Sequence, residues 1–235
     1  MKFVSLAELE ELGGVLEFLG PDAVRFLNGQ VTQDVRLAVG SDQAIPSCVT
    51  DAKGKLQFRI WMAGGDSSES ILVFCREDEK EDLELRLTKY LIADDVEVRD
   101  LSGKFSLEAF GVSSIEDSER IERGIPKWGA ELKAGMLPPE AGLDVTDISY
   151  AKGCYIGQEV ISRIKSAGKV NRRMAKLAFE EDGTLGEMVN LEGKVRGEVT
   201  SVWGRMALGF LKRGTDLDAE LFVDEKRVFL REKGE

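Results

Sequence analysis

One octapeptide, Lys152-Gly153-Cys154-Tyr155-Ile156-Gly157-Gln158-Glu159, holds the residues of this sequence whose types and spacing point to chemistry. Its two glycines give the backbone room to turn, and the apolar residues after it recur at helical spacing, so we expect a helix to begin near Gly157. Cys154 would then lie just before a helix N-terminus, with Lys152 two residues away. Both features lower the pKa of a thiol and favour the reactive thiolate.

Cys154 has a second interpretation, because free cysteines are more often small buried hydrophobic residues. The other cysteines, Cys48 and Cys75, are widely spaced and no Cys-x-x-Cys pair occurs. This spacing argues against a disulfide framework and against a usual zinc or cluster site, so we predict that the chain alone binds no metal. Histidine is absent, and any proton transfer must use carboxylate, lysine, tyrosine or cysteine side chains.

The bulk composition is that of an ordinary globular protein. The chain has 235 residues, 43% of them hydrophobic and 32% charged, which is enough to bury a sizeable core. Its longest apolar runs, such as residues 71–75, are too short to cross a membrane, and we find no secretory signal. The net charge of -11 repels polyanions. We therefore expect a cytoplasmic monomer with no membrane partner and no nucleic-acid partner.

Strand and helix signals are interleaved without a regular βαβ repeat, which predicts a mixed α+β protein. We expect helices that begin at Pro21-Asp22 and over about 78–92, among strands at 14–19, 44–50, 56–62, 70–75, 96–99 and 105–110. Short strands at 174–179, 193–201, 206–211 and 227–230 predict a small antiparallel β-barrel. We place one domain at 1–170, with an inner module at about 45–140, and the barrel at 171–235.

The octapeptide and its surroundings resemble the YgfZ-type folate-binding proteins, which are relatives of the glycine-cleavage T-protein. The matching segments are 20–35, 51–55, 120–126, 138–143 and 147–173. This resemblance implies a T-protein-like ring of modules around a central opening, closed by a C-terminal antiparallel β-barrel. It also implies tetrahydrofolate, or a polyglutamylated derivative of it, as the cofactor.

The resemblance assigns folate-binding residues. Glu122 occupies the place of a glutamate that holds the pterin ring in T-proteins, and a carboxylate can accept two hydrogen bonds from that ring. Without the resemblance, Glu122 would be read as a solvated carboxylate at a helix end. We further assign Tyr155, Gln158, Arg163 and Arg173 to the cofactor.

Between Arg163 and Lys176 the chain has six basic residues and no acid. Such a stretch can hold the glutamyl tail of folate, can bind RNA, or can be a solvated face.

Two positions depart from the T-protein pattern. T-proteins have acidic residues soon after the hairpin glycine, one of which assists amine transfer, whereas the matching segment 53–58 contains Gln57 and Phe58 and no acid. An amide and a phenyl ring cannot handle a proton as a carboxylate does. Cys75 stands where the T-protein pattern has a pterin-contacting asparagine. We therefore do not expect an active aminomethyltransferase.

The sequence thus predicts a tetrahydrofolate-binding accessory protein for assembly or repair of iron–sulfur clusters, including clusters of tRNA-modifying enzymes. Its partners would be folate and iron–sulfur enzymes or assembly factors. Cys154 would be the essential thiol, and Lys152 would favour its thiolate. Two alternatives stay open, a folate-dependent aminomethyltransferase or demethylase that uses another carboxylate such as Asp51, and an RNA-binding module.

Overall fold

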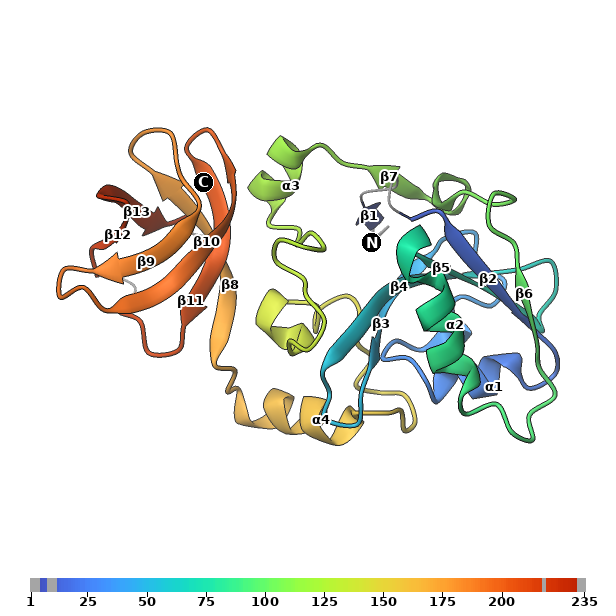
Figure 1. Ribbon diagram of the computed structural model, residues 1–235. Coiled ribbons are helices and arrows are strands. Elements are labelled where there is room, and N and C mark those ends of the chain that lie inside the picture. Colours follow the sequence, from blue (N-terminus) through green and yellow to red (C-terminus); the bar gives the residue numbers. More distant parts are fainter. Residues whose placement is uncertain (1–4, 8–11, 217–218, 232–235) are drawn as a thin grey trace. The chain divides into compact units, whose positions relative to one another are not determined.

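The computed structural model describes residues 5–7, 12–216 and 219–231 (Figure 1). The chain forms two compact units. The first consists of the residues up to Ser114 together with Leu143–Arg163, and the second of Ile115–Gly142 together with the residues from Ile164 onward. Segment 115–142 thus belongs to the second unit, and segment 143–163 belongs to the first. The predicted domain boundaries stay predictions.

The first unit is built on a five-stranded antiparallel sheet of order β3-β4-β5-β2-β6. Two short strands, β1 and β7, pair in parallel beside it. The strands are β1 Ser5–Ala7, β2 Gly14–Leu19, β3 Ile45–Thr50, β4 Leu56–Gly64, β5 Ser70–Cys75, β6 Glu97–Asp100 and β7 Val112–Ser114. The α-helices of this unit are α1 Ala23–Asn28 and α2 Lys80–Thr88, and α4 Gln158–Ala167 begins in it. Short 3-10 helices are η2 Val35–Leu37, η3 Glu77–Glu79 and η4 Leu107–Phe110.

The sheet is buried on both faces, which explains why its central strand is a continuous apolar run. Successive side chains of a strand point to opposite faces. In β5, Ile71 and Val73 therefore join the core under the helices, and Leu72 and Phe74 join the core on the other face. α1 contacts β5 and α2 contacts β2, and the segment that includes η4 packs on the opposite face.

The predicted strand at 105–110 is wrong. The Ser106 side chain accepts a hydrogen bond from the backbone N–H of Glu108, which starts the 3-10 helix η4. Gly111 ends it with a left-handed φ of 74°, a conformation that glycine adopts without strain. The apolar residues Phe105 and Phe110 still pack on the sheet, so burial rather than extended backbone accounts for their hydrophobicity.

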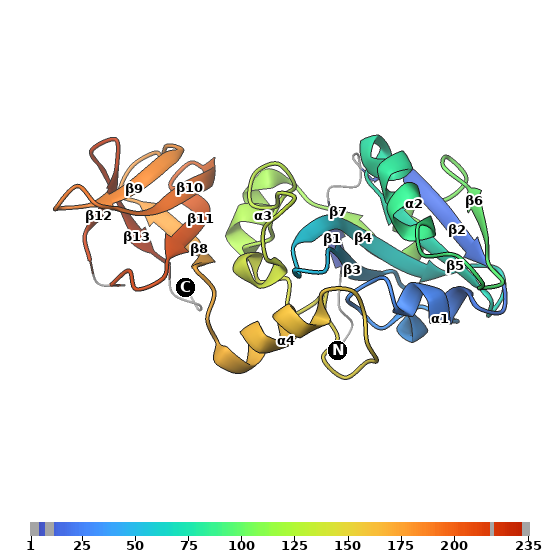
Figure 2. The same cartoon turned by 60° about the horizontal axis from the view of Figure 1, so that its bottom comes forward.

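The second unit contains a closed six-stranded antiparallel barrel of order β10-β11-β8-β13-β12-β9 (Figure 2). Its strands are β8 Arg172–Phe179, β9 Gly186–Asn190, β10 Val195–Trp203, β11 Met206–Lys212, β12 Leu221–Val223 and β13 Lys226–Leu230. Closure pairs every strand on both sides, and the inward side chains form one core. The unit also holds α3 Asp117–Arg123 and the 3-10 helix η5 Pro138–Ala141. The α+β class and the C-terminal barrel are confirmed.

A buried ion pair ties α3 to the barrel. Arg120 on α3, 2% exposed, donates to the Glu131 carboxylate at 3.0 Å and to the Ser201 hydroxyl of β10 at 2.8 Å. Glu131, 1% exposed, also accepts from the Ser201 and Thr200 hydroxyls. Because both charges are saturated with hydrogen bonds, their burial is tolerated.

Among the described residues, no helix has the length and apolar character needed to span a membrane.

We expect Arg120→Met to lower the free energy of unfolding by about 3–5 kcal/mol, because it leaves the buried Glu131 carboxylate without its cation. Urea unfolding followed by the fluorescence of Trp128 and Trp203 measures this effect. Arg123→Met removes an exposed pair of the same helix and should cost less than about 1 kcal/mol. Equal effects of the two substitutions would contradict the structural role of the pair.

Candidate functional site in the octapeptide loop

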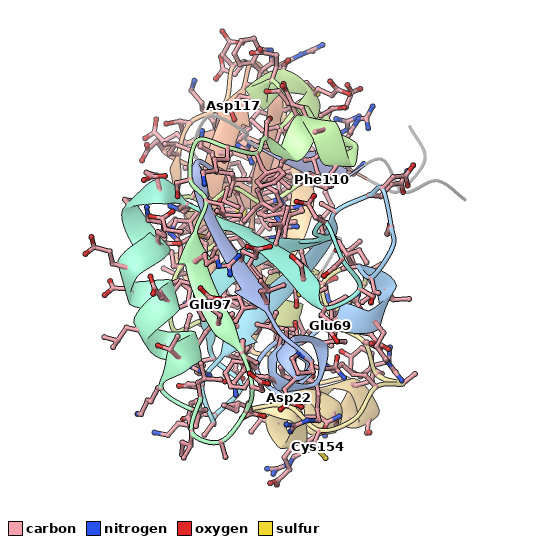
Figure 3. The ribbon with its side chains drawn as sticks, turned by 90° about the vertical axis from the view of Figure 1, so that its right-hand side faces the viewer. Asp22, Glu69, Glu97, Phe110, Asp117 and Cys154 are labelled. Atoms are coloured by element: carbon pink, nitrogen blue, oxygen red, sulfur yellow. The ribbon has the colours of Figure 1, made fainter. Side chains whose placement is uncertain are left out.

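Cys154 is exposed, whereas Cys48 and Cys75 are buried. Figure 3 shows Cys154 at the lower edge of the view. Burial raises the pKa of Cys48 well above its ordinary value and that of Cys75 to about 12, which keeps both thiols protonated. The interpretation of Cys154 as a buried hydrophobic residue is therefore wrong, and Cys154 is the one thiol of the chain that a partner can reach directly.

Lys152 is 6% exposed and holds the chain that follows α1. Its ammonium nitrogen Nζ donates to the backbone carbonyl oxygens of Asn28, Val31 and Gln33, at 2.7, 2.8 and 2.9 Å. Three acceptors use all three protons of an ammonium group. The side chain is thus directed into the fold, and its predicted influence on the Cys154 thiol stays a prediction.

Two opposing effects act on the charge of Lys152. Burial lowers its pKa to about 7, and the nearby Asp34 carboxylate favours the charged form in part. Asp34 is itself paired with Arg36, an ion pair that lowers the pKa of the Asp34 carboxyl. The ring of Tyr155 adds a cation–π contact, with its centroid 5.2 Å from Nζ.

The second half of the octapeptide is fixed to β3 and to the end of α1. The Ile156 carbonyl accepts from the Thr50 hydroxyl at 2.6 Å, and the Ile156 N–H donates to the Gly29 carbonyl at 3.3 Å. Gly157 has a φ of 88°, and a Cβ there would lie 2.4 Å from the Asp51 carbonyl oxygen. Only glycine fits, which confirms the predicted turn before the helix. α4 then begins at Gln158, whose side chain donates to the Gly153 carbonyl at 3.4 Å.

Tyr155 is buried against Ile148 and Ile161, and its exposed fraction is 7%. Its hydroxyl has no hydrogen-bond partner in the described part of the chain. Burial raises the pKa of this hydroxyl above its ordinary value. An unpaired buried hydroxyl costs free energy unless a water or ligand satisfies it. The predicted role of Tyr155 at a cofactor stays a prediction.

The segment that leads into the octapeptide is held by a polar network that the sequence analysis missed. The fully buried Asp147 carboxylate pairs with Arg59 of β4 at 2.8 Å. The Thr32 hydroxyl donates to the Asp147 carbonyl at 2.6 Å. These residues are far apart in sequence, and nothing in the local pattern around Arg59 signals its partner.

The other predicted residues divide between the two units. Arg163 is exposed and pairs with Glu159 one helical turn away. Glu122 and Arg173 belong to the second unit and are both exposed. Within the described residues, the Glu122 carboxylate makes no hydrogen bond or ion pair, so its oxygens are available as acceptors; Lys176 contacts only its backbone carbonyl. Arg172 of the basic stretch is paired with Glu140.

The part of the chain that the structure describes contains no group of histidine, cysteine, aspartate or glutamate side chains that could hold a metal ion.

Comparison with known proteins finds relatives in sequence and a similar solved structure. No family model matches the sequence. An uncharacterised protein of Haemophilus influenzae is 27% identical over 230 residues, which cover 81% of this chain and 79% of that protein. A mitochondrial "iron-sulfur cluster assembly factor IBA57 homolog" of Phaeosphaeria nodorum is 39% identical over 69 residues, which cover 28% of this chain and 17% of that protein.

The solved structure of glycine cleavage system aminomethyltransferase T from Bartonella henselae matches 93% of this chain and 82% of its own chain. The TM-score is 0.77 at 14% sequence identity. The chain therefore has a fold like that of this aminomethyltransferase. The T-protein-like fold class predicted from the sequence is confirmed.

We expect one thiol of this T-protein-like chain to react rapidly with a disulfide reagent such as dithiobis-nitrobenzoate in the native state, and all three cysteines to react in denaturant. The reason is that only Cys154 is exposed. Cys154→Ser should abolish the rapid phase and leave the thermal unfolding curve unchanged. Rapid modification of Cys48 or Cys75, located by mass spectrometry, would disprove the assignment.

The pH dependence of stability tests the burial of Lys152. Between a folded pKa of about 7 and the ordinary value of 10.5, the unfolded chain binds more protons than the folded chain. The contribution of Lys152 to the free energy of unfolding therefore rises with pH in this interval. We expect the difference in this free energy between wild type and Lys152→Met to grow by at most about 1.4 kcal/mol per pH unit.

Urea unfolding at a series of pH values measures this difference, with the exposed Lys53→Met as a control whose difference should stay flat. A difference that stays flat between pH 7 and 10.5 would contradict the lowered pKa, and would mean that the three carbonyl oxygens outweigh burial and keep Lys152 charged throughout.

Proposed function

We propose that this protein is a tetrahydrofolate-binding accessory protein for the assembly or repair of iron–sulfur clusters, and that it acts through Cys154. The observation that carries the proposal is the exposed cysteine in a loop that is otherwise tightly fixed. The relationship to a protein named as an iron–sulfur cluster assembly factor supports the same role. Clusters of tRNA-modifying enzymes are among the clients that we propose.

A cysteine sulfur is the usual protein ligand of iron–sulfur clusters. Cys154 alone cannot hold a cluster, since clusters need several ligands and no group of potential ligands lies among the described residues. It can contribute one sulfur to a cluster that a client or assembly partner carries. An exposed thiol on a fixed loop suits such a transient contact, because little conformational entropy is lost when the partner docks.

We propose that two side chains, each considered within its own unit, contact tetrahydrofolate. Glu122 offers carboxylate oxygens that no other described residue occupies, and Tyr155 offers a buried hydroxyl without a partner. Gln158, Arg163 and Arg173 remain proposed contacts of the cofactor. When bound, the folate would supply a carrier for one-carbon units; the residues of this chain hold and orient it.

A transferase reaction has less support. The position where T-proteins have a carboxylate holds Gln57, whose side-chain oxygen accepts a hydrogen bond from Arg86 at 2.7 Å. An amide cannot take a proton from an amine, and the neighbouring guanidinium repels an ammonium group. Asp51, the alternative carboxylate, already accepts hydrogen bonds from the backbone N–H groups of Lys53 and Lys55 in the hairpin turn.

We expect Cys154→Ala to abolish the function of the protein in a strain that lacks the native gene, measured as the activity of iron–sulfur enzymes in cell extracts. Ala151→Ser changes an exposed residue of the same loop and should restore wild-type activity. Full activity with Cys154→Ala, at equal protein level, would reject the role of the thiol.

The folate proposal has a separate test, which is calorimetric titration with tetrahydrofolate. We expect Glu122→Gln to weaken binding by roughly tenfold to a hundredfold, because it removes a charged hydrogen-bond acceptor. Glu119→Gln on the same helix changes a carboxylate that is paired with Arg123, and it should bind as wild type does. Absence of binding to the wild type would remove folate from the proposal.

A further inference from the structure

Two amide side chains and one backbone carbonyl of the first unit meet around Arg86, a residue of α2. Its Nε donates to the Gln57 side-chain oxygen of β4 at 2.7 Å, and its Nη1 donates to the Gln30 side-chain oxygen at 3.1 Å. Nη2 donates to the Thr50 backbone carbonyl at 2.9 Å. The ring of Tyr90 lies against the guanidinium, 5.3 Å from it.

The side-chain groups of this cluster that remain available to a ligand are N–H donors. A guanidinium has five N–H donors and no acceptor, so it fixes both amides with their oxygens toward Arg86. The side-chain nitrogens of Gln30 and Gln57 must then point elsewhere, and no described residue accepts from them. One proton on each Nη nitrogen is also left over.

Arg86 forms no ion pair with any described residue, and all three of its acceptors are uncharged oxygens. Burial lowers the pKa of Arg86 from its ordinary value, and the nearby Tyr90 and Asp51 counteract this in part. A partly buried guanidinium without an ion pair is a setting in which an anion can bind favourably.

The cluster adjoins the octapeptide. Thr50, whose carbonyl accepts from Arg86, also donates its hydroxyl to the Ile156 carbonyl. Gln30 follows Gly29, whose carbonyl accepts from the Ile156 N–H. Thr50, which holds Ile156, is thus a member of the Arg86 cluster, and Gly29, which also holds Ile156, precedes Gln30 of that cluster. All of these residues belong to the first unit.

We propose that Arg86, Gln30 and Gln57 form a binding site for the carboxylate group of a small-molecule ligand. A planar carboxylate has two oxygens that can accept from the guanidinium and from the flanking amide N–H groups together, and it supplies the missing negative charge. A tetrahedral phosphate shares the charge but not the planar shape. The site excludes amines, and it does not depend on the folate or cluster proposals.

Calorimetric titration of the full chain with sodium acetate, at constant ionic strength kept with sodium chloride, tests the proposal. We expect saturable binding to the wild type, and binding that is roughly tenfold to a hundredfold weaker in Arg86→Gln. Gln57→Asp should also lose acetate binding while keeping the thermal stability of the wild type, since the new carboxylate would pair with Arg86. Lys53→Gln removes a nearby exposed charge and should bind as the wild type does.

Gln57→Asp keeps the proposal testable even where Arg86→Gln fails to fold. Wild-type protein that does not bind acetate, or a Gln57→Asp variant that binds it unchanged, would overturn the proposal. A parallel titration with inorganic phosphate tests the ligand class, and phosphate binding that is tighter than acetate binding would overturn the carboxylate assignment. Failure of the folate titration or of the Cys154→Ala complementation would leave this site unaffected.

Discussion

The geometry of the candidate site depends on the buried ammonium group of Lys152. An ammonium needs three acceptors when it leaves water, and the turn after α1 offers them through the carbonyl oxygens of Asn28, Val31 and Gln33. The same contact therefore closes that turn and fixes the start of the octapeptide. Because Cys154 follows only two residues later, the position of its thiol is set by a cation that is itself turned away from solvent.

Further anchors act on both sides of Lys152. Asp147 and Arg59 tie the preceding segment to β4, and Thr50 and Gly157 tie the following turn to β3. Between these fixed points Ala151, Gly153 and Cys154 are exposed, and Cys154 is the one of the three with a reactive side chain. The charged groups of Lys152 and Asp147 thus stabilise the loop from the interior, and the Cys154 sulfur is left at the surface.

The sequence predicts regular elements well where a local pattern determines them. The strands Gly14–Leu19 and Ser70–Cys75 match the prediction at both ends, since turn residues bound their apolar runs. β9 and β12 were missed because both are short and are defined by their partners in the barrel rather than by a long local pattern. The roles of Lys152, Asp147 and Arg86 could not be predicted for a related reason. Each is decided by partners more than 28 residues away, and a charged residue carries no local mark of burial.

The similarity in fold to an aminomethyltransferase does not extend to the side chain at position 57 that the sequence comparison with T-proteins predicts. A TM-score of 0.77 at 14% identity shows that the backbone arrangement survives extensive replacement of side chains. An aspartate at position 57 would pair with Arg86, and each charge would cancel the other. The glutamine instead accepts from the guanidinium and leaves its charge uncompensated. In the proposed site, the glutamine at position 57 and the guanidinium without an ion pair therefore act together, since both favour an anion over an amine.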